Sequence, residues 1–192
     1  MTKRKPNTAT KSDQDLMVTI LNHMFPEFRW DDSVERTAER FLAYLEEYSM
    51  AATFEPPFQA TVFPTKVNQM IAAGPISFSS ICKHHLLPYV GYAWTAYLPN
   101  KLMIGASKMP RIVQWCATKP TTQEELTAEI ATYLKNKLEA QGVAVIMVAK
   151  HTCMSCRGVR EREANLVTSE MRGAFLSNAA AKAEFMHFVR LP

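Results

Sequence analysis

The sequence predicts an α+β domain in which two helices cover one face of an antiparallel sheet, preceded by N-terminal helices. The first observation is the order of the periodic segments, which runs helices, strands, two helices, strands and a last helix. The second is the length of 192 residues, which corresponds to one domain with an additional arm. The third is the composition, 47% apolar and 21% charged, which is typical of a globular protein.

The first 55 residues predict a basic tail followed by a helical arm. Residues 1–12 are expected to be a disordered tail, because the charged side chains up to Lys11 are all basic. Residues 13–55 are expected to form the arm, and residues 56–192 the main domain. The arm holds two expected helices, one over Asp13–Phe25 and one that begins after Asp32 or Ser33.

The main domain alternates strand and helix signals. Residues that commonly cap helices mark the two expected helix starts. Ser107 is the expected N-cap of the first helix. Thr121 or Thr122 is the expected N-cap of the second, with Glu124 or Glu125 as its capping-box acid. The expected strands are residues 58–82 with an interruption at Gly74-Pro75, Tyr89–Leu98, Lys101–Ile104, Val143–Cys153 and Ser169–Phe175; the expected helices are residues 107–117, the helix ended by Gly142, and Ala179–Val189.

Charge and hydropathy exclude several classes of protein. The net charge of +4 resides in the tail, so the remainder of the chain is neutral and broad binding to nucleic acid is not expected. No apolar run approaches the ~20 residues that a membrane helix needs, and the basic start lacks the apolar core expected of a signal peptide. We therefore expect a cytoplasmic protein with no membrane partner, whose four cysteines are reduced.

Two short segments combine cysteine with histidine and indicate a zinc site. Cys82 and His85 have the Cys-x2-His spacing of zinc ligands, and Cys153 follows 68 residues after His85. On the expected strand, His151 and Cys153 point to the same face. His84 and His151 would then lie beside the ligands, where they can move protons.

Other interpretations of these cysteines stay open at this point. Cys156 forms a Cys-x2-Cys pair with Cys153, so four side chains can close a structural zinc site. Alternatively, Cys82 and Cys153 are core thiols or a disulfide. A zinc nucleoside deaminase is a weaker candidate, because its His-x-Glu and Pro-Cys-x-x-Cys pattern is absent.

A second group of residues suits a phosphorylated nucleotide. Lys108 and Arg111 follow Ser107 at an expected helix start, where free backbone N–H groups favour phosphate. Arg157 can add another positive charge. Glu124 can accept hydrogen bonds from the N1–H and amino groups of guanine, or it can be the capping acid of its helix.

Four segments together resemble the GTP cyclohydrolase I family. Residues 78–89 (FSSICKHHLLPY) resemble its C-E-H-H-L-L-P-F signature, and residues 104–113 (IGASKMPRIV) resemble I-G-L-S-K-x-x-R-I-V. Residues 122–127 (TQEELT) resemble V-Q-E-R-L-T, and residues 151–159 (HTCMSCRGV) resemble H-x-C-M-x-x-R-G-V. The similarity extends from about residue 32 to residue 190.

The resemblance implies a fold, an assembly and a role for each matching residue. The implied fold is the tunnelling fold (T-fold), with residues 56–192 as the catalytic domain, in a toroidal homodecamer whose active sites lie at subunit interfaces. It implies these roles: Cys82, His85 and Cys153 as Zn²⁺ ligands; His84, His151 and Ser107 as proton-transfer residues; Glu124, with Gln123 beside it, for guanine; and Lys108, Arg111, Arg157 and Arg40 for triphosphate.

The implied reaction is the hydrolysis and rearrangement of GTP to 7,8-dihydroneopterin triphosphate and formate by a zinc-activated water. Such a product can feed tetrahydrofolate, biopterin or 7-deazaguanine synthesis. The alternative is a catalytically inactive zinc-containing relative that binds nucleotide or serves assembly. Its only support is Lys83 in place of glutamate and Ala43 in place of lysine. Two further departures from the family pattern are Glu125 in place of arginine and Cys156, which matches no family ligand.

Overall fold

The structure is a computed structural model of the chain, and it describes residues 8–28, 33–49 and 56–189. The chain divides into two compact units, Met1–Phe54 and Glu55–Pro192. The division falls one residue from the predicted boundary between the arm and the main domain. Residues 1–7 of the predicted tail lie outside the described residues.

The N-terminal unit contains helix α1 (Lys11–Met24) and helix α2 (Val34–Glu47). Helix α1 begins two residues earlier than predicted. Thr10 is its N-cap: the Thr10 hydroxyl accepts from the backbone N–H of Asp13, and the Asp13 carboxylate accepts from the backbone N–H of Thr10. Asp13 is therefore the third residue of the helix. Ser33 precedes α2, as predicted.

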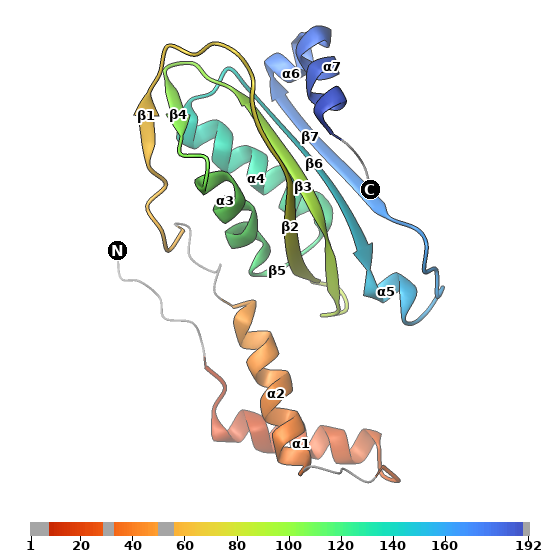
Figure 1. The fold of residues 1–192 in the computed structure, drawn as a ribbon. Coiled ribbons are helices and arrows are strands. Elements are labelled where there is room, and N and C mark those ends of the chain that lie inside the picture. The colour runs from red at the N-terminus through yellow and green to blue at the C-terminus, as the bar shows by residue number, and fades with distance from the viewer. Residues whose placement is uncertain (1–7, 29–32, 50–55, 190–192) are drawn as a thin grey trace. The chain divides into compact units, whose positions relative to one another are not determined.

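The C-terminal unit is built on a five-stranded sheet with the order β5-β2-β3-β6-β7 (Figure 1). The long strands are antiparallel, whereas the two-residue β5 runs parallel to β2. A separate antiparallel pair joins β1 to β4. The strands are β1 (Val62–Pro64), β2 (Ile71–Cys82), β3 (Pro88–Leu98), β4 (Leu102–Ile104), β5 (Pro120–Thr121), β6 (Gly142–His151) and β7 (Leu166–Gly173).

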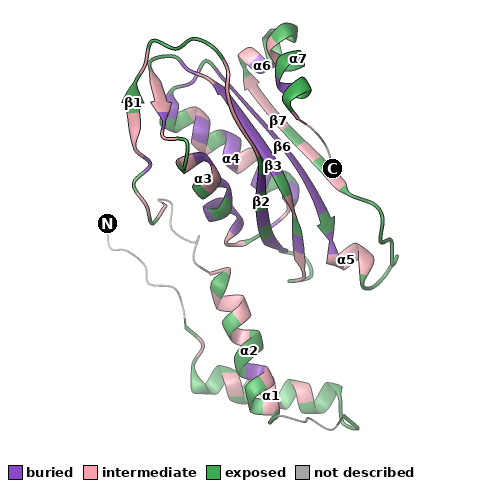
Figure 2. Ribbon diagram, in the orientation of Figure 1, coloured by how far each residue is buried: buried purple, intermediate pink, exposed green. Residues whose placement is uncertain are grey.

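Helices α3 (Lys108–Ala117) and α4 (Gln123–Leu138) lie on one face of this sheet, as predicted (Figure 1). The two helices present buried faces to the sheet, coloured purple in Figure 2. The odd-numbered residues of β6 face them, because side chains alternate along a strand. The side chains buried in this layer include Ile112, Leu126, Ile130, Leu134, Val143, Val145 and Met147.

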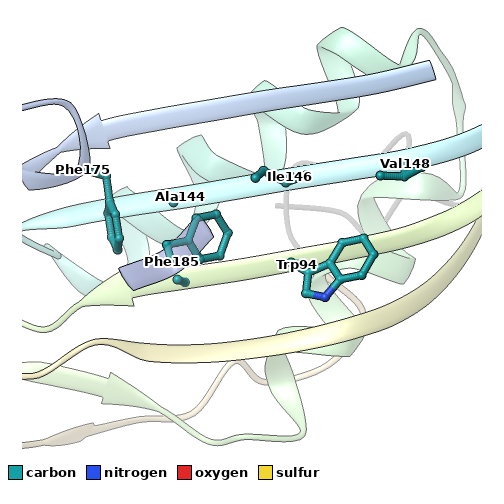
Figure 3. Packing of buried hydrophobic residues seen from close by; sticks show 7 residues of the cluster. Trp94, Ala144, Ile146, Val148, Phe175 and Phe185 are labelled. Atoms are coloured by element: carbon teal, nitrogen blue, oxygen red, sulfur yellow. The ribbon is translucent and has the colours of Figure 1, made fainter. Parts of the chain in front are cut away.

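Helices α6 (Ala174–Ser177) and α7 (Ala179–Phe188) cover one end of the opposite face. Phe175 and Phe185 pack there against Trp94 and against the even-numbered residues Ala144 and Ile146 of β6 (Figure 3). Farther along the same face, apolar side chains are solvent-exposed. They are Val90 (52%), Tyr92 (43%) and Val167 (51%). The sheet is therefore fully covered on one side only.

The ends of several elements differ from the predictions. Helix α4 ends at Leu138, with Glu139 in the left-handed conformation (φ 47°), three residues before the predicted stop at Gly142. Gly142 instead begins β6, where it pairs with Gly173 and a Cβ atom would lie 2.9 Å from the backbone nitrogen of Ala174. The glycine thus serves close packing of strands.

Strand boundaries also shift. Residues 58–82 form β1 and β2 separately, and β2 continues through Gly74-Pro75 with a register shift between Ala73 and Ile76. The predicted strand 169–175 is β7 followed by α6. Among the helices of the described residues, none has both the length and the apolar character needed to cross a bilayer.

We predict that Gly91→Ala lowers the free energy of unfolding by about 3 kcal/mol, near the upper end of what overpacking costs. An added Cβ would lie 1.9 Å from the Val148 carbonyl oxygen, and that backbone is held in the middle of the sheet. Urea unfolding measures the effect. Gly105→Ala is the matched control, because its Cβ would meet nothing closer than 3.7 Å. Equal stability of the two variants would contradict the packing argument.

Candidate active site

A tight turn between β2 and β3 carries the first two metal-ligand candidates. The backbone N–H groups of His85 and Leu86 donate to the Cys82 carbonyl at 3.2 and 2.8 Å, and Cys82 N–H donates to the Leu87 carbonyl at 2.9 Å. Leu86 adopts a positive φ of 53°, which side-chain-bearing residues rarely do. The turn places Cys82 Sγ 3.9 Å from His85 Nδ1.

Cys153 reaches the same place from another element. Strand β6 ends at His151, and Cys153 lies in the short helix α5 (Thr152–Ser155). The prediction that His151 and Cys153 share one face of a strand is therefore wrong. The Thr152 hydroxyl donates to the Pro88 carbonyl at 2.6 Å and holds α5 against the start of β3.

Cys82, His85 and Cys153 form a group that fits a metal ion. Their ligand atoms lie within 4.8 Å of one another. Tetrahedral zinc with Zn–S and Zn–N bonds of ~2.0–2.3 Å separates its ligand atoms by about 3.4–3.8 Å, so small movements would complete the geometry. Burial and the neighbouring Cys82 thiol raise the pKa of Cys153. A cation would reverse this effect by stabilising both thiolates.

The described part of the chain contains neither the disulfide nor the four-ligand group. All four cysteines are free, so Cys82 and Cys153 form no disulfide. Cys156 is exposed and lies outside the metal-ligand group, so a four-ligand Cys3His site does not form. The three-ligand arrangement leaves a coordination position for water, which is the pattern of catalytic zinc sites.

His151 lies beside this group, buried and in a defined orientation. Its Nε2 is 2.9 Å from Oε1 of Gln123, which can only accept, so Nε2 carries the proton and Nδ1 is the nitrogen that can exchange one. The Tyr89 ring stacks on the imidazole with a centroid separation of 4.5 Å and an interplanar angle of 3°. Burial lowers the pKa of His151, and the charge of Glu124 opposes this effect.

Gln123 differs from its predicted role beside the guanine. The side chain is fully buried. Its Nε2 lies within 3.0–3.2 Å of the Met147 and Leu166 carbonyls and of the Thr168 hydroxyl, which identifies the nitrogen end of the amide. Gln123 is thus satisfied within the chain and positions His151.

Two threonines complete this network. The Thr127 hydroxyl donates to the Gln123 carbonyl at 2.6 Å, so Thr168 must supply the proton of the 2.6 Å contact between the two hydroxyls. Thr168 Oγ1 is then free to accept from Gln123. Sequence reasoning missed Thr127, Thr168 and Tyr89 as supports of the site. Tyr89 and Thr127 are the last residues of two segments that resemble the family, whereas Thr168 lies outside all four.

The capping box of α4 separates the two adjacent glutamates. Thr122 is the N-cap, and Glu125 is the acid that accepts from the Thr122 backbone N–H at 3.3 Å. Glu124 is not the capping acid and is exposed at the same helix start. Its carboxylate is therefore available to a ligand, and its effect on the pKa of His151 places it within electrostatic reach of that side chain.

Lys83 and Glu125, two departures from the family pattern, contact each other. The Lys83 ammonium forms an ion pair with Glu125 Oε1. This hydrogen bond is the largest of the causes that lower the pKa of Glu125. Relative to the family pattern, the charge is therefore reversed both at Lys83 and at its partner Glu125 on α4.

The phosphate-binding candidates divide into separate groups. Helix α3 leads at its C-terminal end into β5, which pairs with Cys82, whereas Ser107, Lys108 and Arg111 lie at its other end (Figure 1). Ten helical residues span about 15 Å. Arg157 is exposed, and its charge opposes the effect of burial, which raises the pKa of Cys153. His84, a proton-transfer candidate, is also exposed, and its ring lies beside that of His85. Arg40 belongs to α2 in the N-terminal unit.

The comparisons with known proteins identify the family of this chain. The sequence model of the family GTP cyclohydrolase I matches residues 15–190, and the chain belongs to that family. Membership makes it an enzyme, a GTP cyclohydrolase I with the tunnelling fold. Its segment 56–189 shows the sheet and the two helices expected of that fold.

Two relatives with known names support the assignment to the family. The chain is 42% identical to GTP cyclohydrolase 1 of Hydrogenobaculum sp. (strain Y04AAS1), over 83% of this chain and 86% of that protein. It is 37% identical to GTP cyclohydrolase 1 2 of Pseudomonas syringae pv. tomato, over 83% and 87%. Among solved structures, an archaeosine synthase QueF-Like in the apo form matches with a TM-score of 0.43 and 11% identity, over 55% of this chain and 92% of that one.

We predict that the protein binds one zinc ion per chain and that Cys153→Ser lowers the zinc affinity more than about 100-fold, beyond the usual effect of an outer-shell change. Competition with a chromophoric chelator and metal analysis by mass spectrometry measure this. Cys156→Ser is the control, because it makes the same chemical change outside the ligand group. Equal zinc binding by the two variants would refute the ligand assignment.

Proposed function

We propose that the protein converts GTP to 7,8-dihydroneopterin triphosphate and formate, with Zn²⁺ as its cofactor. The observation that carries the proposal is the group of Cys82, His85 and Cys153 beside a buried His151 whose Nε2–H is held by Gln123. The chemistry that zinc supplies, when held by these three ligands, is a water nucleophile at neutral pH, because the ion lowers the pKa of water toward ~7.

Guanine recognition is assigned to Glu124. Its carboxylate is exposed in the first turn of α4 and is not used in the capping box. It can accept hydrogen bonds from the N1–H and amino groups of guanine. In the proposed complex, a purine held by this carboxylate lies with its imidazole ring toward His151, on whose pKa the charge of Glu124 acts. His151 first takes up a proton from water at Nδ1 and then gives that proton to N7, which makes C8 electrophilic. His84 and Ser107 move protons at the ribose.

The triphosphate is assigned to Lys108, Arg111, Arg157 and Arg40. Within one chain, Lys108 and Arg111 lie at the end of α3 away from the metal ligands. We propose that these two residues serve the active site of a neighbouring subunit. The family implies an oligomer, and we propose a toroidal decamer with active sites between subunits. Exposed apolar side chains on the sheet, Val90 and Val167 among them, suit such contacts.

The inactive relative is the less favoured alternative. Its main support, the inverted charge of Lys83, loses weight because Glu125 neutralises that charge. We also propose a cytoplasmic location, with GTP as the small-molecule partner and no nucleic acid or membrane.

Incubation of the zinc-loaded protein with GTP tests the reaction. We expect formate and neopterin, measured by fluorescence after iodine oxidation, in equal amounts. Formate alone would mean that the purine ring opens but the ribose rearrangement fails. Neither product, with zinc bound in equal stoichiometry, would favour the inactive relative.

Glu124→Gln is expected to raise the KM for GTP about 10- to 100-fold, because hydrogen bonds to a charged group contribute roughly 1.5–3 kcal/mol. Steady-state kinetics of neopterin formation measure it. The control is Glu129→Gln on the same helix, for which we expect the KM to stay within about twofold of the wild type. An unchanged KM for Glu124→Gln would remove this residue from guanine binding.

A further inference from the structure

The Lys83–Glu125 ion pair joins the two parts of the site that must be held at a fixed separation. Lys83 lies in the turn between the ligand candidates Cys82 and His85. Glu125 lies in the first turn of α4, next to Glu124 and two residues from Gln123. The pair thus connects the metal-binding turn with the helix turn that holds His151 and faces the guanine.

The main chain supports the same connection. The Lys83 N–H donates to the Thr121 carbonyl at 3.4 Å, and Cys82 pairs with Thr121 where β2 meets β5. Glu125 is fixed from its own side by the capping box with Thr122. Because the acid is already oriented by its helix, the ion pair mainly restrains Lys83 and the turn that carries it.

We propose that Lys83 and Glu125 are a positioning pair, which fixes the metal-binding turn against the first turn of α4. Where the C-E-H-H and Q-E-R segments of the family have glutamate and arginine, this chain has lysine and glutamate, so both charges of the pair are reversed together. The inference rests on the proposed function, since it assigns the pair to the zinc and guanine sites. It assigns neither residue a contact with the substrate.

A charge-swap experiment tests the proposal. The variants are Lys83→Glu, Glu125→Arg and the double variant Lys83→Glu/Glu125→Arg. The side chains are 40% and 54% exposed, so the attraction is modest, and each single reversal replaces it with repulsion. We expect each single reversal to lower kcat about three- to tenfold, with a smaller change in KM. The double variant should recover to within about twofold of the wild type.

Zinc affinity gives a second readout that does not depend on turnover. A new charge near the metal changes the affinity by itself, but this effect is additive and cancels in the double-mutant cycle. We expect the two substitutions to be non-additive in the zinc dissociation constant by about threefold or more. The control is Lys119→Glu, which reverses the charge of a residue outside α4 that pairs with Glu129 on that helix. It should lower the thermal midpoint only.

Additive effects in both kcat and zinc affinity would overturn the proposal, as would wild-type kcat in both single reversals. If a reversal prevents folding, as judged by circular dichroism, the neutral cycle of Lys83→Met and Glu125→Gln replaces it and is read by the same criteria. If the wild type forms no neopterin, the proposed reaction fails. The cycle in zinc affinity still decides whether the pair positions the metal-binding turn.

Discussion

The register of β2, β3 and β6 is the constraint on which the site depends. Ser80 of β2, Tyr89 of β3 and His151 of β6 are direct neighbours across the sheet. The end of β2 at Cys82 and the end of β6 at His151 therefore lie on either side of the start of β3, and Cys153 follows β6 closely. A slip of two residues would keep the same side chains buried but would move the thiols apart by about 6–7 Å. The metal group exists because this register is held.

The register is held by packing on both faces of the sheet and by polar contacts at its edge. Met147 and Val145 are buried under α4, while Ala144 and Ile146 pack against α6 and α7. Gln123 adds directional contacts from α4 to β6 and β7. A glutamine suits this position because its neutral oxygen accepts from His151 without favouring the charged imidazolium. A carboxylate in its place would raise the pKa of the histidine.

Electrostatic compensation explains how the chain departs from its family without losing the site. A lysine between two metal ligands would repel a dication if it stood alone. Its partner, Glu125, lies at a helix N-terminus, where a carboxylate is favoured and where the capping box already holds it. Lys83 and Glu125 each look unfavourable as single departures from the family pattern, but together they form an ion pair in which the two charges compensate each other.

The sequence by itself determined the fold class, the two helices on one face and the residue types of the metal group, because hydrophobic period and caps are local and the ligand spacings are short. It also limited the candidates for the N-cap of α4 to two threonines and the candidates for its capping-box acid to two glutamates. It did not place Cys153 in a helical turn, since the end of β6 depends on the contact of Thr152 with Pro88. It also could not separate Glu124 from Glu125.

Only the tertiary structure assigned Gln123 to His151 and paired Lys83 with Glu125. These partners are 28 and 42 residues apart in the chain. No local propensity records contacts at such separations, because strand register and helix packing create them. Tertiary structure also placed Lys108 and Arg111 at the end of α3 opposite to the one that leads into β5, which pairs with Cys82.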